Sequence, residues 1–567
     1  MNKLAWLFAG CFIFILSPLL LASCVSEPSS APARTLSTTS EISQLLQKKK
    51  QIEDALAMGS PGSLEQVLEL TQEGASIPES DSKAYAWLAY EMARLVYPEI
   101  SADLPSTNIT PPDSNLVKAF IDARNGKIST AITDSGPLYE LFPSLVIFRL
   151  KTPAASGAAL TALERYSRFA QASALAELVR GLALERSGDL GAALSAYTKA
   201  ESLAPDCYPA SMGRARIFLE QSKGQAALDA LASLGSSLND NSQVKRLRAL
   251  ALYQEKRWDE AWPLVTAVLL ADPMDSKFLL IRAHMLVERG EYKQAAPLLD
   301  AYASLNPGDR LYIMLRARSS FESAKDRKAA IAALKTGMQK YPDDTEMMGY
   351  GAELMWGGDK EEKQEAVRIS DRLLSLDPDN PKAIRVLLSS SLADGDNEKA
   401  ASIADRIQAS GIIFTDYEAL YKAYYRAGRL TEAAKMAEKW RTKEPLSEPA
   451  AIASVTVLLD SGKKQEAAQL IGKLLAIKGS SSYRSSLYWL QSRTQGNDEA
   501  VLSSLRSALV ENGMNIDALA AISDFYIKKE DYQKARFYLK QAISIAPDRP
   551  DIASQRDKLL QQGLAFP

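Results

Sequence analysis

The sequence predicts an all-α solenoid, in which short helix pairs stack one on the next. Prolines recur at a nearly fixed interval, since Pro273, Pro307 and Pro342 are 34 and then 35 residues apart. Before each proline stands the same order of residues: a glycine or charged turn, then an alanine, then an apolar stretch. Two short helices fill such an interval, and a period of this length marks repeat architectures. Because stacked repeats form long binding surfaces, the pattern favours binding over catalysis.

Alanines and prolines keep one register through the repeats. An alanine stands where the second helix must pass close to the first, and a larger side chain there would cost roughly 1–3 kcal/mol. These residues are Ala193, Ala261, Ala295, Ala330, Ala366, Ala400, Ala433, Ala467 and Ala535. Twelve residues later a proline ends the helix, because proline lacks an N–H and crowds the preceding turn. These residues are Pro205, Pro273, Pro307, Pro342, Pro378, Pro445 and Pro547.

Glycines supply a third feature in the same register. Five residues before the alanine, a glycine closes the turn between the two helices, at a position where the backbone needs a positive φ. These residues are Gly188, Gly290, Gly395, Gly428 and Gly462. Three independent physical requirements therefore agree, which a chance set of alanine-rich helices would not achieve.

The clearest copy allows the pattern to be compared with a known family. It reads Gly181, Leu184, Gly188, Ala193, Tyr197, Ala200 and Pro205. This arrangement resembles the tetratricopeptide (TPR) repeat, from about Leu175 to Pro547. The resemblance implies a right-handed superhelix of helix-turn-helix repeats over residues 171–549. The copies near Ala227 and after Ala400 lack the closing proline, and residues 476–511 form a weak copy, so the repeat count stays open. The interval from Pro342 to Pro378 is stretched, with the extra length expected within residues 356–361.

The N-terminus has the features of a secretory signal. Lys3 gives a positive start, and residues 4–20 are apolar apart from Ser17. The next four residues, Leu21-Ala22-Ser23-Cys24, resemble the lipobox of bacterial lipoproteins. That resemblance implies that residues 1–23 are removed and that Cys24 is acylated. An uncleaved membrane helix and ordinary signal cleavage are the alternatives. By the same resemblance, Val25 after the cysteine favours the outer membrane over the inner one.

Two further segments lie between this signal and the clear repeats. Residues 24–40 carry the lipid site and are rich in Ser, Thr and Pro, which predicts a flexible tether. Residues 41–170 predict helices without a clean register, at 42–58, 63–73, 81–97, 113–125 and 138–150. We favour degenerate repeats that form the N-terminal end of one solenoid, and a separate small helical domain is the alternative. At the other end, residues 550–567 predict a capping helix and tail.

Composition limits the possible partners. The 67 Lys and Arg residues nearly balance the 69 Asp and Glu residues, so no strongly basic surface for nucleic acid is expected. The run Lys48-Lys49-Lys50 could favour an anionic lipid surface, although a solvated helix face is the favoured interpretation. Of three cysteines, Cys11 lies in the signal and Cys24 is the lipid site, which leaves no disulfide in the mature chain. Cys207 is expected to be a small, partly buried residue at a repeat junction.

His284 is the single histidine, and this limits the chemistry that the chain could perform. No Ser-His-Asp or Cys-His set with a family motif, no zinc-binding histidine pair and no GxxxxGK[ST] phosphate loop occurs. We therefore predict no enzyme activity, no metal site and no cofactor.

The predicted binding surface follows from the TPR resemblance, which implies that the first helices line a concave groove. Side chains three and four residues apart share one helix face. In this register the groove includes Arg246, Tyr253, Lys277, His284, Tyr312, Lys422, Tyr425 and Arg426. Aromatic and arginine side chains are the types that anchor partners.

The leading hypothesis is a non-enzymatic, membrane-anchored lipoprotein of the bacterial envelope, located at the outer membrane and facing the periplasm. It would bind a partner protein or an extended peptide in its groove. The alternative is a ligand-binding accessory lipoprotein of a transport system, which a closed cavity lined by aromatic residues would favour. An envelope enzyme whose catalytic part lies in residues 41–170 is a third hypothesis.

Overall fold

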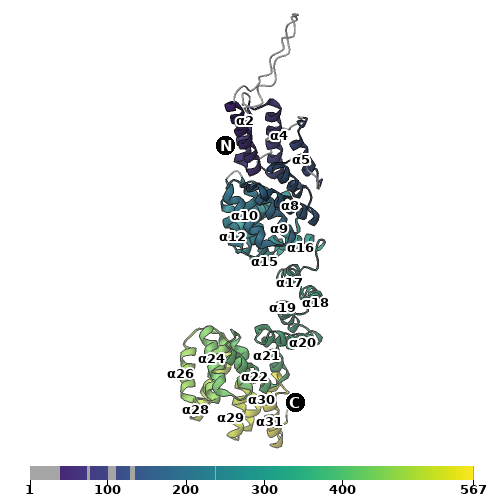
Figure 1. The fold of residues 1–567 in the computed structure, drawn as a ribbon. Coiled ribbons are helices and arrows are strands. Elements are labelled where there is room, and N and C mark those ends of the chain that lie inside the picture. Colours follow the sequence, from purple (N-terminus) through teal and green to yellow (C-terminus); the bar gives the residue numbers. More distant parts are fainter. Residues whose placement is uncertain (1–38, 73–76, 100–109, 128–134, 236–237, 566–567) are drawn as a thin grey trace, which may run out of the picture. The chain divides into compact units, whose positions relative to one another are not determined.

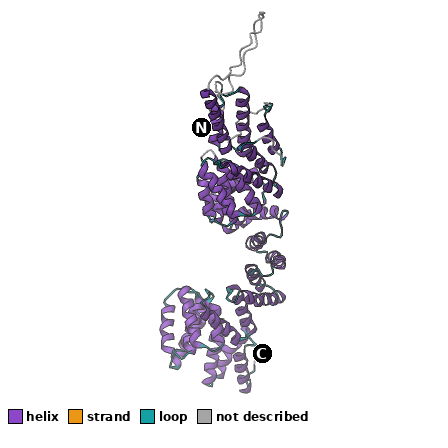
Figure 2. Cartoon of the chain, in the orientation of Figure 1, coloured by secondary structure: helices purple, strands orange, loops and turns teal. Residues whose placement is uncertain are grey.

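The computed structural model describes residues 39–72, 77–99, 110–127, 135–235 and 238–565. Every regular element in these ranges is a helix (Figure 2), so the all-α prediction is confirmed. The predicted signal, Cys24 and residues 25–38 lie outside the described residues. Helix α2 already begins at Thr39, two residues inside the predicted tether. None of the described helices is long and apolar enough to cross a bilayer.

The helices form two compact units, one up to Pro307 and one from Gly308 onward (Figure 1). The first unit opens with the part that lacks a repeat register. Its elements are α2 (Thr39–Met58), α3 (Pro61–Leu70), α4 (Glu79–Val96), α5 (Asn115–Arg124), α6 (Pro137–Leu141), the 3-10 helix η1 (Phe142–Leu145), α7 (Val146–Arg149), α8 (Pro153–Tyr166) and the 3-10 helix η2 (Ser167–Phe169). The single helix predicted over 138–150 is therefore broken. Pro143 lies at the break, where its missing N–H and its ring prevent a continuous α-helix.

Four helix pairs complete the first unit. They are α9 (Ala174–Ser187) with α10 (Leu190–Leu203), α11 (Tyr208–Glu220) with α12 (Gly224–Ala232), α13 (Ser242–Gln254) with α14 (Trp258–Ala271), and α15 (Ser276–Glu288) with α16 (Tyr292–Ala303). Within this unit α10, α12 and α14 also pack on the first helix of the next pair, and α11 contacts both α9 and α13. This is the packing of a solenoid, in which each repeat is buried by its neighbours.

The second unit continues with the same kind of pair and closes with one further helix. The pairs are α17 (Arg310–Ala324) with α18 (Arg327–Lys340), α19 (Thr345–Trp356) with α20 (Lys360–Leu376), α21 (Pro381–Asp394) with α22 (Asn397–Ser410), α23 (Tyr417–Arg426) with α24 (Leu430–Lys443), α25 (Glu448–Asp460) with α26 (Lys464–Leu475), α27 (Ser481–Ser492) with α28 (Asp498–Glu511), and α29 (Ile516–Lys528) with α30 (Tyr532–Ile545). Helix α31 (Pro550–Gln561) packs on α29 and α30.

The register read from the sequence is reproduced in these pairs. All nine register alanines are fully buried and lie in second helices. Each register proline follows the end of a second helix. After α10, for example, Ala204 is extended at φ −145° and ψ 99°, and Pro205 comes next. The five register glycines all have positive φ, between 72° at Gly428 and 87° at Gly188. The physical roles assigned to these three residue types are therefore confirmed.

The same turn geometry also occurs where no glycine is present. Ser222, Lys256, Lys325 and Glu530 stand five residues before a buried alanine, and their φ values lie between 52° and 60°. An L-residue in this left-handed region is disfavoured by roughly 1–2 kcal/mol. The helix pair therefore imposes the turn, and glycine only relieves its strain.

Helix α20 explains the stretched interval before Pro378. In most pairs the buried alanine is four residues after the N-cap, as Ala193 is after Asp189. In α20 it is seven residues after, since Asp359 is the N-cap and Ala366 the alanine. The extra length is therefore an additional turn at the start of this helix, within and just after the predicted segment.

One core joins the helices without register to the first repeats. A single cluster of buried side chains runs from Ile52 in α2 to Ala251 in α13. Polar contacts support the junction: the Tyr97 hydroxyl lies 3.6 Å from the sulfur of Cys207, and the Gly62 N–H donates to Asp206 at 2.7 Å. Cys207 is buried at this junction, where burial raises its thiol pKa to about 11.

Tyr197 shows why two glycines are needed inside helices. Its ring lies between α9 and α11, and a Cβ added at Gly181 or at Gly213 would stand 2.5 Å from a ring carbon. No side chain fits at either position without moving the ring. The tyrosine hydroxyl bonds to Glu185, which also binds Arg216 of α11 through two hydrogen bonds of 2.8 Å.

Candidate functional site

The predicted site residues all lie on first helices of the pairs, from α13, α15, α17 and α23. We call the exposed side of the first helices the first-helix surface. In the first unit it comprises α9, α11, α13 and α15. In the second it comprises α17, α19, α21, α23, α25, α27 and α29. The two parts are described separately.

In the first unit, neighbouring repeats bring Tyr253 and His284 together. The Tyr253 hydroxyl and the Nδ1 atom of His284 share a hydrogen bond of 2.6 Å, and their rings meet edge to face. The Nε2 atom of His284 lies 3.8 Å from a carboxylate oxygen of Glu288. Burial raises the pKa of Tyr253 to about 12, and the charge of Glu288 adds to that shift. Both predicted residues are therefore tied into a contact between α13 and α15.

The two cations predicted beside this pair differ in what they do. Arg246 forms an ion pair with Asp275, the N-cap of α15, and its guanidinium lies 5.0 Å from the centre of the Phe278 ring. Arg246 thus helps to fix the start of the next repeat. Lys277 is exposed, and it forms no ion pair with any residue that the structure describes.

Tyr312 does not fit the predicted groove. Its side chain is buried, with 9% of its surface exposed, so the expectation of an exposed anchor there is wrong. The reason is a slip of one residue within this repeat. Ala330 follows the N-cap Asp309 by 21 residues, whereas Ala295 follows Asp275 by 20. One residue turns a helix by about 100°, which moves Tyr312 from the surface to the core.

In the second unit, two of the three predicted residues of α23, Tyr425 and Arg426, contact the neighbouring first helices. The Tyr425 hydroxyl donates to Asp460 of α25 at 2.5 Å, and Arg493, the C-cap of α27, donates to the same carboxylate at 2.6 Å. Arg426 donates to the carbonyl of Leu392 in α21 at 2.8 Å. Four consecutive first helices are thereby connected through polar side chains.

Lys422 is exposed and pairs only with Glu418, one turn earlier on α23. Such an exposed pair within one helix contributes roughly 0.3–0.5 kcal/mol. A partner's carboxylate could therefore replace Glu418 beside Lys422 at little cost in free energy. Lys422 therefore resembles Lys277 in being available for a partner.

Sequence reasoning missed the acidic members of these contacts. Asp460 is one, and Glu353 of α19 is another, with Arg385 of α21 at 3.1 Å and Lys382 at 3.6 Å. Glu185 is the third. The repeat register holds the missing signal, because Asp460 and Arg426 both stand seven residues before a register alanine. Across the nine copies that position is charged in six, so the register indicates a frequently charged position without identifying its partners.

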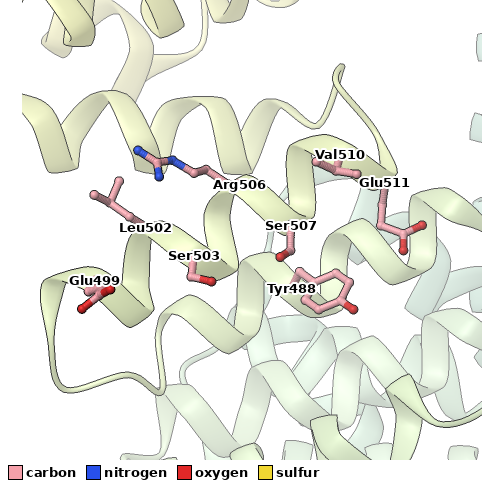
Figure 3. A pocket seen from close by; sticks show the side chains of 8 residues that line it. All are labelled: Tyr488, Glu499, Leu502, Ser503, Arg506, Ser507, Val510 and Glu511. Atoms are coloured by element: carbon pink, nitrogen blue, oxygen red, sulfur yellow. The ribbon is translucent and has the colours of Figure 1, made fainter.

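A separate hollow of about 510 Å³ lies on the second helix α28 (Figure 3). Its lining residues are Tyr488, Glu499, Leu502, Ser503, Arg506, Ser507, Val510 and Glu511. Seven of these come from α28 at spacings of three and four, so they form one outward face of that helix. Val510 is 86% exposed, and five of the eight lining residues are polar or charged. This hollow is open and polar, unlike a closed cavity for a small apolar ligand.

No cluster of three or more His, Cys, Asp or Glu side chains suited to a metal ion occurs among the described residues. Beside carboxylates such as Asp460 and Glu418, the first-helix surface presents lysines, arginines and aromatic hydroxyls. These groups recognise carboxylates, carbonyls and apolar side chains, which are the groups that a polypeptide offers.

Comparison with protein families assigns the helix pairs. The tetratricopeptide repeat family matches residues 184–251, 246–310 and 516–549. These stretches are tetratricopeptide repeats. The matched stretches contain α10 to α16 in the first unit, and α29 and α30 in the second. The resemblance read from the register of alanine, glycine and proline is therefore confirmed for these repeats.

Solved structures with TPR repeats are also found, although a search of curated proteins finds no match. Yeast Tom70 is 15% identical with a TM-score of 0.28, and the similarity covers 75% of this chain and 96% of that one. A TPR protein from Parabacteroides merdae is 14% identical with a TM-score of 0.29, covering 53% and 98%. YrrB, described as a TPR protein with an unusual peptide-binding site, is 16% identical with a TM-score of 0.28, covering 32% and 93%. These scores are low, and the fold assignment rests on the repeat matches and on the helix pairs.

Proposed function

We propose that this protein is a non-enzymatic scaffold that binds a partner protein or an extended peptide along its first-helix surface. The observation that carries the proposal is the series of first helices, which carry polar side chains and, in α13, α15 and α23, aromatic rings or the imidazole of His284 beside them. A TPR array of this kind presents an extended surface rather than a pocket.

The contacts between neighbouring first helices support the proposal physically. Arg246 with Asp275, Tyr253 with His284, and Tyr425 with Asp460 each join one repeat to the next. These contacts hold the surface in one arrangement before a partner arrives. A preformed surface binds more tightly, because less conformational freedom is lost on association.

The exposed lysines give the proposed surface its charge preference. Lys277 in the first unit and Lys422 in the second project from the first helices, and neither is committed to a neighbouring repeat. A partner segment that carries acidic side chains beside apolar or aromatic ones would complement this surface.

The anchoring part of the proposal rests on the sequence. We propose that Cys24 is acylated and holds the protein at the bacterial envelope, at the outer membrane on its periplasmic side. Each buried CH₂ of an acyl chain contributes about 0.8 kcal/mol, so several chains hold a protein firmly on a bilayer. The scaffold would then gather its partner at the membrane surface.

Acylation has a direct test in cells. Cys24→Ala should abolish labelling by a clickable fatty acid and release the protein from membranes or leave it as a precursor. Labelling that persists in Cys24→Ala would refute the anchoring. Arg34→Ala, in the predicted tether, serves as the control and should keep both label and membrane association.

Partner binding is tested on the exposed lysines. Lys277→Glu together with Lys422→Glu should lower co-purification of an envelope partner at least tenfold without changing the melting temperature. Arg246→Glu is a poorer probe, because it would repel Asp275 and disturb the start of α15. Lys473→Glu, exposed on the second helix α26, is the matched control. Equal loss of partner in the control and in the double variant would contradict the proposal.

A further inference from the structure

Helix α2 carries an apolar stripe of which only one half is covered by the protein. The stripe consists of Ile42, Leu45, Leu46, Ile52 and Leu56. Leu45 and Leu46 follow Ile42 by three and four residues, Ile52 follows Leu46 by six and Leu56 follows Ile52 by four, which places all five on one side of the helix. Ile52 and Leu56 are fully buried against the core. Ile42 is 44% exposed and Leu46 is 61% exposed, although they continue the same stripe.

The covered half begins near Leu45, which packs partly against the core. Lys49 marks the same boundary through its ion pair with Asp81 of α4. Between Glu41 and Gln47, every residue except Leu45 is exposed. The first two turns of α2 therefore extend past the packed body and present apolar side chains to the surroundings.

Basic side chains flank the exposed half of the stripe. With about 100° per residue, Lys48 and Lys50 lie on opposite sides of the line through Ile42 and Lys49. Neither of these two lysines forms an ion pair with another residue in the described ranges. An apolar strip bordered by lysines is the arrangement of helices that lie at a lipid surface, where the lysine amines reach the headgroups.

The position of α2 in the chain indicates what covers this strip. Only fourteen residues separate Cys24 from Thr39, so even a fully extended chain places the start of α2 within about 50 Å of an acylated Cys24. We propose that the first turns of α2 contact anionic lipid headgroups of the bilayer that holds the acyl chains. This proposal rests on the proposed anchoring. The contact orients the first unit against the membrane, while the acyl chains supply the attachment.

The test uses the mature-length chain with Cys24→Ser, which removes the acyl site and isolates the contribution of α2. Vesicles of phosphatidylcholine with phosphatidylglycerol should sediment this protein at low salt, and vesicles of phosphatidylcholine alone should not. Ile42→Ser with Leu46→Ser should lower the partition coefficient at least tenfold. Lys48→Gln with Lys50→Gln should lower it about fivefold per lysine and remove its salt dependence.

Matched controls keep the test specific. Leu376→Ser changes an equally exposed apolar residue of α20, and Lys528→Gln changes an exposed lysine of α29. Both controls should partition as the parent does, and circular dichroism should show unchanged helix content in every variant.

Several results would overturn the proposal. Failure of the unacylated parent to bind anionic vesicles is one, and binding of the α2 variants as strong as that of the parent is another. If sedimentation without lipid shows a dimer that Ile42→Ser with Leu46→Ser dissociates, the strip is an interface between two copies instead. Acyl labelling of Cys24 in cells is a separate measurement. Labelling of Cys24 without vesicle binding would refute only the proposed lipid contact of α2. Vesicle binding without labelling would refute only the proposed anchoring.

Discussion

Helices α2–α8 and the pairs from α9 onward are built differently, although both are helical and one core joins α2–α8 to the first pairs. In the pairs, the same residue types recur at the same positions with the same role: glycine in the turn, alanine at the buried contact and proline after the second helix. In α2–α8, each contact occurs once. Trp87 and Phe120 meet edge to face at 6.0 Å, Phe120 and Phe142 at 5.5 Å, and the buried Glu91 binds Arg124. The difference shows that a repeated contact can be read from sequence spacing, whereas a contact made once cannot.

The largest expected effect comes from Trp87→Ala in the part without register. Trp87 is buried, and truncating a buried Trp to Ala costs roughly 3–5 kcal/mol. Because one core runs from α2 to α13, hydrogen exchange should become faster in α9 and α10 as well as in α4. Trp262→Ala, at a half-buried site of α14 outside this core, should leave exchange in α4 unchanged. Unchanged protection of α9 in Trp87→Ala would make α2–α8 a separate domain.

Ala295→Trp tests the register itself. Ala295 is fully buried, and overpacking there should lower the free energy of unfolding by roughly 1–3 kcal/mol or more. Gln294→Trp places the same side chain on the exposed side of α16 and should be nearly neutral. Urea denaturation of both variants provides the measurement. Equal midpoints for the two variants would show that the register is misplaced in this repeat.

Glu185→Gln tests a contact inside the repeats that occurs only once. Burial alone would raise the pKa of Glu185, but the hydrogen bonds and charge of Arg216 outweigh it, so the pKa lies below its ordinary value near 4.5. The variant should lose roughly 1–3 kcal/mol at neutral pH. Since the folded pKa is lowered, this stability is present above about pH 4.5 and is lost as the pH falls through the folded value.

Urea midpoints measured from pH 7 to pH 3 check this expectation. The difference in urea midpoint between the parent and Glu185→Gln should become steadily smaller as the pH is lowered. Glu260→Gln, in the exposed pair with Arg257, should show almost no gap at any pH. A gap that stays constant with pH would mean that the Glu185 carboxylate does not carry the effect.

The smallest effects come from the turns. Glu530→Gly removes a side chain from a residue with φ of 60° and should stabilise the second unit by up to about 1 kcal/mol. Gly462→Ala at the equivalent turn should destabilise by a similar amount. A Cβ at Gly462 meets no atom within 4 Å, so the backbone conformation alone is tested. Thermal unfolding of the two variants should shift in opposite directions, and shifts of the same sign would contradict the shared geometry.

The repeats could be predicted from the sequence because each requirement is local. The proline, the glycine with positive φ and the buried alanine stand at fixed distances from one another in each repeat. The nine alanines then identify nine second helices. The surface was predicted less well. Tyr312 is buried because one extra residue between the N-cap and the register alanine rotates its helix. Amino-acid composition does not indicate such a shift in register. Asp460 was missed because its role depends on partners more than 30 residues away, Tyr425 and Arg493.

Helices α2–α8 illustrate what spacing cannot provide. Helix α8 was not predicted as a separate element, and the break at Pro143 divided one predicted helix into three short ones. The break follows from Pro143 itself, a local signal that the sequence prediction overlooked. Helix α8, by contrast, contributes Ala159, Leu163 and Tyr166 to the core around Phe120 and Phe142, which joins residues far apart in the chain. Physical arguments from single positions do not reach such contacts.

Site-specific photocrosslinking in intact cells tests the central claim most directly. A photoreactive residue replaces Lys277, Lys422 or Arg426 on first helices, or Gln294 or Lys473 on second helices. A scaffold that binds through the first-helix surface should give one and the same crosslinked protein at the first three positions and none at the last two. Crosslinks that are absent from the first helices, or equally strong on the second helices, would contradict the account.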